Sequence, residues 1–124
     1  PKLPILARLI QAYKQWHEFS SHFPKSSRYT LGTKIDLLFL ETLEATLIAS
    51  YLNRKEKLPY VFKASTKLDV LKFFLQVTWE IKAMDSKKFI ILSEYLDEVG
   101  RMLGGWQRQI TKENSAQTGG ESRQ

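Results

Sequence analysis

The sequence predicts an all-α protein, an antiparallel up-down-up-down bundle of four helices. Apolar residues recur at steps of three and four along four long segments, which is the period of an amphipathic helix. Short polar or proline-containing stretches separate these segments, and no segment alternates apolar and polar residues as a strand would. At 124 residues, the chain is long enough for one domain with a hydrophobic core.

The first helix is expected over about residues 5–22. Its apolar stripe runs from Leu6 to Phe23, and Pro4 stands near its first turn, where proline is tolerated. The helix must end at Phe23, because Pro24 lacks an N–H group and disfavours the α conformation in the preceding residue. Serines and a threonine after Pro24 can cap the next helix. This stretch is therefore predicted to be the corner of a helical hairpin.

The second helix is expected over about residues 29–53, and it is apolar around most of its circumference. One stripe consists of Ile35, Leu38, Phe39, Thr42, Ala45 and Ala49. A second stripe beside it consists of Leu37, Leu40, Leu47 and Ile48. A helix of this kind is either central in a bundle or in contact with another chain. Because no helix is fully enclosed in a four-helix unit, the second stripe predicts a subunit interface.

The third helix is expected over about residues 63–84, with Thr66 and Asp69 resembling a capping box. The fourth is expected over about 86–112, after an N-cap at Asp85-Ser86. The bundle then occupies residues 1–112. The remaining residues, 113–124, contain almost no apolar side chain and are predicted to be a disordered polar tail.

Composition narrows the possible functions. Lysine and arginine outnumber aspartate and glutamate by 19 to 13, giving a net charge of +6. This balance favours a polyanionic partner, with nucleic acid first and an acidic protein surface second, although solubility alone also accounts for such a charge. The absence of cysteine excludes disulfides and thiolate metal sites. No apolar run is long enough to span a membrane and the start has no signal-peptide pattern, so we expect a cytoplasmic protein without a membrane partner.

Basic residues gather at the predicted ends of the bundle. The end that holds the first and third connections contains Lys25, Arg28, Lys34, Lys82, Lys87 and Lys88. The opposite end contains Arg54, Lys55, Lys57, Lys63 and Lys67, with Arg8, Arg101, Arg108 and Lys112 expected nearby. Lysines near helix ends also arise for helix-dipole and solubility reasons. We nevertheless favour functional basic ends that contact a polyanion.

No catalytic or metal-ligating set is identified. In the segment from His17 to His22 the two histidines are five residues apart, about 140° around a helix, whereas a zinc-protease motif requires four. Neither Glu41/Glu44 nor Glu94/Glu98 precedes a histidine as a di-iron bundle requires. No residue is a convincing base for a serine or threonine nucleophile. The sequence therefore predicts a protein without enzymatic activity, metal or cofactor.

Three glycines within the fourth helix, Gly100, Gly104 and Gly105, each cost about 1 kcal/mol relative to alanine in a helix interior. The spacing of Gly100 and Gly104 places two bare backbone patches on one face, which permits close approach of another helix. The alternatives are a frayed end or a kink. We favour close packing, either within the bundle or between subunits.

Two separated motifs resemble one known family. The corner sequence FPKSSRYTLGTKI (residues 23–35) and the terminal sequence GRMLGGW (residues 100–106) resemble those of accessory variability determinant (Avd) proteins of diversity-generating retroelements. These belong to a four-helix-bundle family that also includes proteins encoded in ribosomal-RNA intervening sequences. The resemblance covers about residues 4–112.

The resemblance implies a non-catalytic, basic homopentamer that binds RNA or DNA and the reverse transcriptase of a retroelement, supporting mutagenic cDNA synthesis and retrohoming. The alternative is a structural adaptor of the intervening-sequence type without a role in reverse transcription. Carried over by position, the fold and interface residues are Phe23, Pro24, Tyr29, Leu31, Gly32, Gly100, Gly104, Gly105 and Trp106. The expected contacts to phosphate or polymerase are Lys25, Arg28, Lys34 and Arg101. Lys87, Lys88, Arg54, Lys55 and Lys57 are added on charge alone.

Overall fold

The computed structural model describes the backbone of residues 2–122 and the side chains of residues 4–116, and this part of the chain is helical throughout, apart from short connections. The elements are α1 (Lys2–Ser20), α2 (Lys25–Ser27), the π-helical turn η1 (Arg28–Gly32), α3 (Thr33–Tyr51), α4 (Arg54–Glu80) and α5 (Ser86–Ser122). Four of them are long helices, and the described residues contain no strand. The predicted all-α fold class is confirmed.

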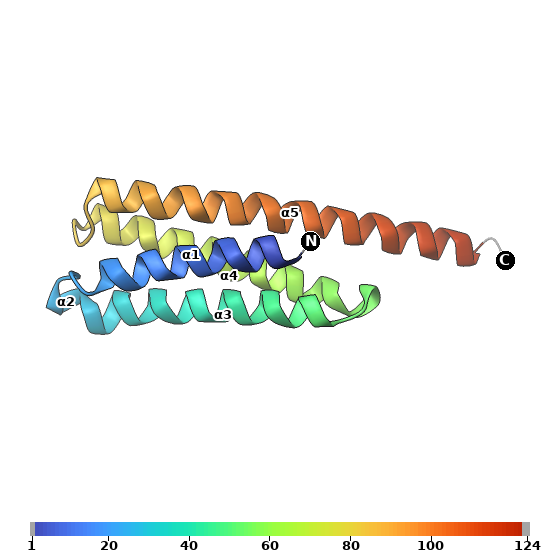
Figure 1. Cartoon of the computed structure of the whole chain (residues 1–124), viewed down its shortest axis with the longest axis horizontal. Coiled ribbons are helices and arrows are strands. Elements are labelled where there is room, and N and C mark those ends of the chain that lie inside the picture. The colour runs from blue at the N-terminus through green and yellow to red at the C-terminus, as the bar shows by residue number, and fades with distance from the viewer. Residues whose placement is uncertain (1, 123–124) are drawn as a thin grey trace.

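The four long helices lie side by side, and α5 extends well beyond the others (Figure 1). The α1–α3 and α4–α5 connections lie at one end, which we call the corner end, and the α3–α4 connection lies at the other, the far end (Figure 1). Contacts join α1 to α3, α3 to α4, α4 to α5 and α5 back to α1. The helices therefore enclose one core, and the start of α1 lies beside the middle of α5 (Figure 1).

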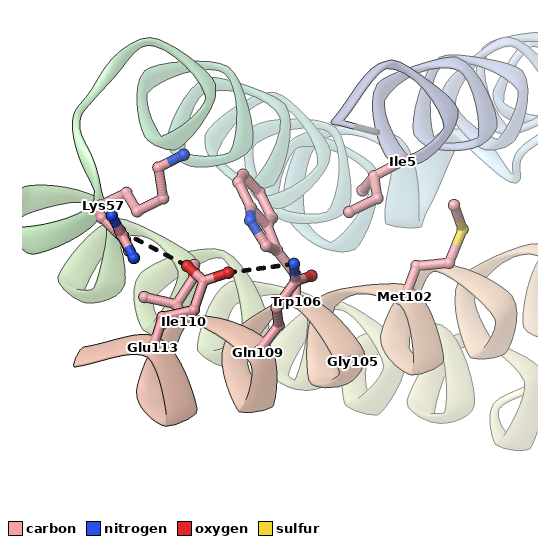
Figure 2. Close-up of a pocket in the computed structure, with 9 residues that line it drawn as sticks. Ile5, Lys57, Met102, Gly105, Trp106, Gln109, Ile110 and Glu113 are labelled. Atoms are coloured by element: carbon pink, nitrogen blue, oxygen red, sulfur yellow. Dashed lines mark hydrogen bonds and ion pairs between the residues drawn. The ribbon is translucent and has the colours of Figure 1, made fainter. Parts of the chain in front are cut away.

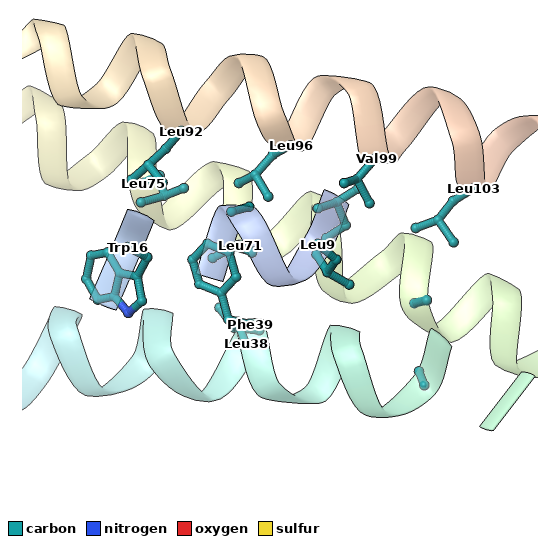
Figure 3. Close-up of a cluster of buried hydrophobic side chains, with 14 of the residues drawn as sticks. Leu9, Trp16, Leu38, Phe39, Leu71, Leu75, Leu92, Leu96, Val99 and Leu103 are labelled. Carbon is teal, nitrogen blue, oxygen red and sulfur yellow. The ribbon is translucent and has the colours of Figure 1, made fainter. Parts of the chain in front are cut away.

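Each long helix contributes fully buried side chains to this core (Figure 3). They include Leu9 and Trp16 from α1, Leu38 and Phe39 from α3, Leu71 and Leu75 from α4, and Leu92, Leu96, Val99 and Leu103 from α5. Every residue of the first apolar stripe predicted on α3 is buried. The hydroxyls of the buried Thr42, Thr46 and Thr78 donate to carbonyls one turn earlier in their own helices, so none of them is left without an acceptor.

A carboxylate between α1 and α3 joins these helices. Asp36 Oδ1 accepts hydrogen bonds from the Tyr13 hydroxyl at 2.9 Å and from Trp16 Nε1 at 3.2 Å. The Trp16 ring also stacks on Phe39, with ring centroids 6.2 Å apart, and meets Phe23 edge-on. Burial, and then the bond to Asp36, raises the pKa of the Tyr13 hydroxyl above its usual value, so it remains a neutral donor.

The third helix begins earlier and ends earlier than predicted: α4 spans Arg54–Glu80, not 63–84. Its N-cap is Asn53, whose side chain accepts from the Glu56 backbone N–H at 3.1 Å and donates to the Glu56 carboxylate. Pro59 lies inside the helix, in its second turn, where its missing N–H removes one backbone hydrogen bond. The helix ends before Lys82, which adopts a left-handed conformation with φ of 65°.

The first connection also differs from the prediction. The first helix ends at Ser20 rather than 22, and helical backbone resumes at Lys25, passes through the π turn and reaches Tyr51 rather than 53. No serine side chain caps α2, η1 or α3. The backbone N–H of Thr33, which opens α3, already donates to the carbonyls of Arg28 and Thr30 in the preceding turn, so it needs no capping hydroxyl. The predicted N-cap at Asp85 is confirmed, since its carboxylate accepts from the Lys88 N–H at 2.9 Å.

The predicted disordered tail is replaced by helix over residues 113–122, because α5 continues without a break to Ser122. Glu113 accepts from Gln109 one turn earlier, and it also lies 3.7 Å from the Arg54 guanidinium. Extending an existing helix needs no new nucleation, and Glu113, Ala116, Gln117 and Glu121 have high helix propensity, although Gly119 and Gly120 do not. Residues 123 and 124 lie outside the described part of the chain.

We expect Asp36→Ala to lower the free energy of unfolding by about 2 kcal/mol, because it leaves the buried Trp16 N–H without its acceptor. Urea denaturation of the variant measures this change. Asp69→Ala is the matched control, since Asp69 is exposed and has no partner among the described side chains. Equal destabilisation by the two substitutions would contradict a joining role for Asp36.

Candidate nucleic-acid and partner interfaces

The corner end brings the two connections together. A cavity of about 190 Å³ is lined by Phe23 and Pro24 from the first connection, by Met84 and Asp85 from the second, and by Lys88 from the start of α5, among others. The Lys88 ammonium lies 5.7 Å from the centroid of the Phe19 ring of α1. Basic residues that are about sixty positions apart in the sequence therefore share one end of the bundle.

The predicted cations of the corner end differ in their partners. Lys25 and Lys87 are exposed, and neither has a hydrogen bond or ion pair to another described residue. Lys88 lies 3.9 Å from the Asp85 carboxylate, and Lys34 lies 6.0 Å from the centroid of the Phe74 ring. Lys82, in the second connection, is likewise exposed without a side-chain partner, so Lys25, Lys82 and Lys87 are the cations of this set that are free to bind an anion.

Arg28 has a structural role that the sequence did not indicate. Its Nη2 donates to the backbone carbonyls of Ser21 and Phe23, both at 3.3 Å. These carbonyls follow the last turn of α1, where acceptors lack helical partners. The guanidinium therefore holds the chain reversal, which reduces its availability for phosphate.

The residues of the corner motif divide into buried and exposed groups. Phe23 is buried against Trp16, Gly32 is buried beside Phe23, and Leu31 is half-buried. Pro24 is exposed, and Tyr29 is 74% exposed with no ring contact among the described residues. An interface role remains open for Tyr29, whereas Phe23 and Gly32 act within the fold.

At the far end, three predicted cations occupy the first turn of α4. Arg54, Lys55 and Lys57 lie where the free N–H groups already make a helix positive. Cations at this position are unfavourable for the helix itself, so helix-dipole stabilisation does not explain them. Lys87 and Lys88 occupy the same kind of position in α5. Both ends therefore combine basic side chains with the positive end of a helix.

A groove between α4 and α5 brings part of this charge next to the terminal motif (Figure 2). We call it the far groove. It has a volume of about 490 Å³ and is lined by Ile5, Arg54, Lys57, Met102, Gly105, Trp106, Gln109, Ile110 and Glu113. The Lys57 ammonium lies 5.5 Å from the centroid of the Trp106 ring. Two groups of predicted site residues, one chosen on charge and one on a motif, thus meet in this groove.

The terminal glycines are not explained by close packing inside the chain. A Cβ atom on Gly100 would lie 3.5 Å from Leu68, an ordinary contact distance. A Cβ atom on Gly104 or Gly105 would meet only the flexible Arg108 guanidinium, at 3.4 and 3.9 Å. The predicted packing within the bundle is therefore wrong for Gly104 and Gly105, and the alternative of a contact outside the protomer stays a prediction.

Arg101, the predicted anion contact within the terminal motif, is exposed and has no partner among the described side chains.

The second apolar stripe of α3 lies on the surface. Leu37, Leu40 and Leu47 are 42–48% exposed, and Ile48 is half-buried. Tyr51 extends the stripe and is 81% exposed. The spacing of Tyr51 from Leu47 continues the step of four, so this extension of the stripe could also have been predicted from the sequence. The stripe is an apolar surface suited to a protein contact.

The described residues contain no cluster of three or more potential metal ligands. Ser21 lies 3.2 Å from His22 Nδ1, but its hydroxyl donates to the Glu18 carbonyl at 2.7 Å, so the histidine is not placed to take that proton. No helix in the described range has the length and apolar character needed to span a membrane.

We expect Arg28→Ala to lower the free energy of unfolding by about 1 kcal/mol, because the carbonyls of Ser21 and Phe23 lose a charged donor. Lys25→Ala removes the same charge at the same corner and should change stability by less than about 0.5 kcal/mol. Chemical denaturation compares them, and an equal effect would contradict the role given to Arg28.

Comparison with protein families places the chain in one of them. The family model described as bAvd-like matches residues 5–110, which include both motifs, all of α3 and α4, and most of α1 and α5. No curated protein matches the chain.

Proposed function

Because the chain belongs to the bAvd-like family, we propose that it is a non-catalytic accessory protein that binds nucleic acid and the reverse transcriptase of a diversity-generating retroelement. Its role is to support mutagenic cDNA synthesis and retrohoming. The bAvd-like family is a family of accessory proteins and not one of known enzymes, which is why the proposal includes no reaction. RNA, DNA and the polymerase are the proposed partners.

The observation that carries the proposal is the placement of cations on the first turns of α4 and α5. Arg54, Lys55 and Lys57 stand at one end of the bundle, and Lys87 stands at the other, the end that also holds Lys25. Side-chain charge and helix dipole have the same sign at each end, so their potentials add and attract phosphates. An accessory protein that holds a nucleic acid for a polymerase needs such sequence-independent contacts.

Self-association forms part of the proposal. We propose that the four long helices run alternately up and down. The placement of their connections at opposite ends of the bundle supports this arrangement (Figure 1). The exposed stripe of α3, with Leu37, Leu40 and Leu47, packs against another copy of the chain, and five copies form a barrel. Repeating the basic ends around such a barrel would give rings of positive charge that attract a polyanion more strongly than one protomer does.

A second candidate function is a structural adaptor whose basic ends bind an acidic protein. The exposed apolar stripe of α3 favours a protein partner as much as a second copy of the chain. A competition experiment separates the two functions. If the basic ends bind nucleic acid, added RNA or DNA should displace an acidic protein from the same surfaces. If the protein is an adaptor alone, nucleic acid should leave the acidic protein bound.

Charge reversal tests the nucleic-acid contacts. We expect Lys25→Glu and Lys87→Glu each to weaken binding of a structured RNA by roughly five- to ten-fold, because each loses a phosphate contact and adds repulsion. Fluorescence anisotropy at moderate salt measures the affinity.

Lys14→Glu is the matched control, since Lys14 is exposed on α1 and has no partner among the described side chains. It makes the same change in net charge away from the two connections, and its effect should be less than about three-fold. If all three reversals weaken binding equally, only net charge matters and the proposed surface is wrong.

Light scattering coupled to size exclusion tests the assembly. The wild-type chain should have a mass about five times 14.4 kDa. Leu40→Glu should reduce this mass to that of a monomer, because an apolar contact would otherwise bury an unpaired carboxylate. Ile90→Glu, at an apolar residue of α5 with 54% exposure, is the control and should leave the mass unchanged. A wild-type monomer, or dissociation by Ile90→Glu alone, would contradict the α3 interface.

A further inference from the structure

The far groove has an open aromatic donor. The chain has three tryptophans, and two of them use their indole N–H within the fold: Trp16 donates to Asp36 and Trp79 donates to Ser86 at 2.9 Å. Trp106 has no hydrogen-bond partner among the described residues. Its ring is half-buried in the groove and contacts a cation, Lys57, at one face (Figure 2). An aromatic face and an unused donor are therefore available together.

The groove also has a bare backbone edge. Gly105 lines it next to Trp106, and neither Gly104 nor Gly105 is required by packing against other parts of the described chain. Glycine in a helix interior is unfavourable relative to alanine, so two adjacent glycines without a packing reason indicate a need for access from outside. A flat group that approaches the backbone beside the indole ring meets only the guanidinium of Arg108, the far end of a flexible side chain that can move aside.

Two cations stand at the rim beside the aromatic ring. Arg54 faces Glu113 at 3.7 Å, with both side chains well exposed, so this ion pair is weak and a phosphate can replace the carboxylate. Lys57 can exchange its contact with the Trp106 ring for the same phosphate. Both lie in the first turn of α4, whose free N–H groups add to the positive potential.

We propose that the far groove binds one nucleotide of a single strand, with the base stacked on Trp106 and its phosphate held by Arg54 and Lys57. The inference rests on the proposed function and adds a defined subsite to it. A volume of about 490 Å³ lies in the range of small-ligand sites. Stacking on an aromatic side chain beside basic residues is the usual way in which single strands are bound without sequence specificity.

The experiment compares three probes on the full chain: a ten-nucleotide oligouridine, an abasic strand with the same number of phosphates, and uridine monophosphate. Affinities are measured by anisotropy or calorimetry at one salt concentration. We expect the wild-type chain to bind oligouridine about ten-fold more tightly than the abasic strand, because only the former can stack. Uridine monophosphate should bind far more weakly than either strand.

Trp106→Ala should abolish the preference for oligouridine and leave abasic binding within two-fold. Trp106→Phe, which retains an aromatic face, should retain most of the preference and guards against a folding defect, as does a thermal melt of each variant. Lys57→Gln should weaken both strands. Tyr29→Ala is the matched control, because Tyr29 is an exposed aromatic at the corner end, and it should leave the preference unchanged.

The possible failures are distinguishable. If the protein binds both strands with equal affinity, or if Trp106→Ala retains the preference, the subsite is wrong while the proposed function stands. If Tyr29→Ala abolishes the preference instead, stacking occurs at the other end and the subsite is again wrong. If uridine monophosphate binds as tightly as oligouridine, the groove binds free nucleotides rather than a strand. If no probe binds at low salt, both the subsite and the nucleic-acid function are overturned.

Discussion

The Asp36 carboxylate accepts two hydrogen bonds from α1, and the position of the first helix on the second depends on this contact. Tyr13 and Trp16 lie one turn apart and reach the same oxygen atom, which fixes both the rotation and the height of α1. Trp16 in turn packs on Phe23 and Phe39, so the chain reversal after α1 is attached to the core. The reversal then carries Lys25 to the corner end, beside the start of α5. Positioning of the charged surface thus follows from a polar contact inside the bundle.

Helix direction determines where charge accumulates. When consecutive helices connect at alternating ends, the first turn of α4 lies at the far end and the first turn of α5 lies at the corner end (Figure 1). Both turns are rich in lysine and arginine, against the preference of a helix for acidic residues there. The resulting loss of helix stability is offset by packing along the rest of each helix. These cations therefore lie at positions where the helix dipole disfavours them for folding and would add to the attraction of an anion.

Much of the fold could be predicted from apolar periodicity, which identified the four helices and every buried residue of the first stripe on α3. The start of α4 could not, because the Asn53–Glu56 cap precedes the apolar pattern and Pro59 interrupts it. Asp36 was missed because a lone carboxylate on an amphipathic helix usually faces solvent. The far groove was also missed, since it forms only when the beginning of α4 meets α5, about fifty residues later in the chain.

The most direct test of nucleic-acid binding by the basic ends is the salt dependence of the affinity for a structured RNA, compared with the affinity for polyglutamate of equal charge. If the basic ends bind phosphates, log affinity for RNA should fall linearly with log salt, with a slope of roughly 0.9 for each phosphate neutralised on a duplex and a total well above 2. RNA should also bind more tightly than polyglutamate at every salt concentration. Equal or tighter binding of polyglutamate would contradict nucleic-acid binding as the function of the basic ends, and the adaptor function would then replace it.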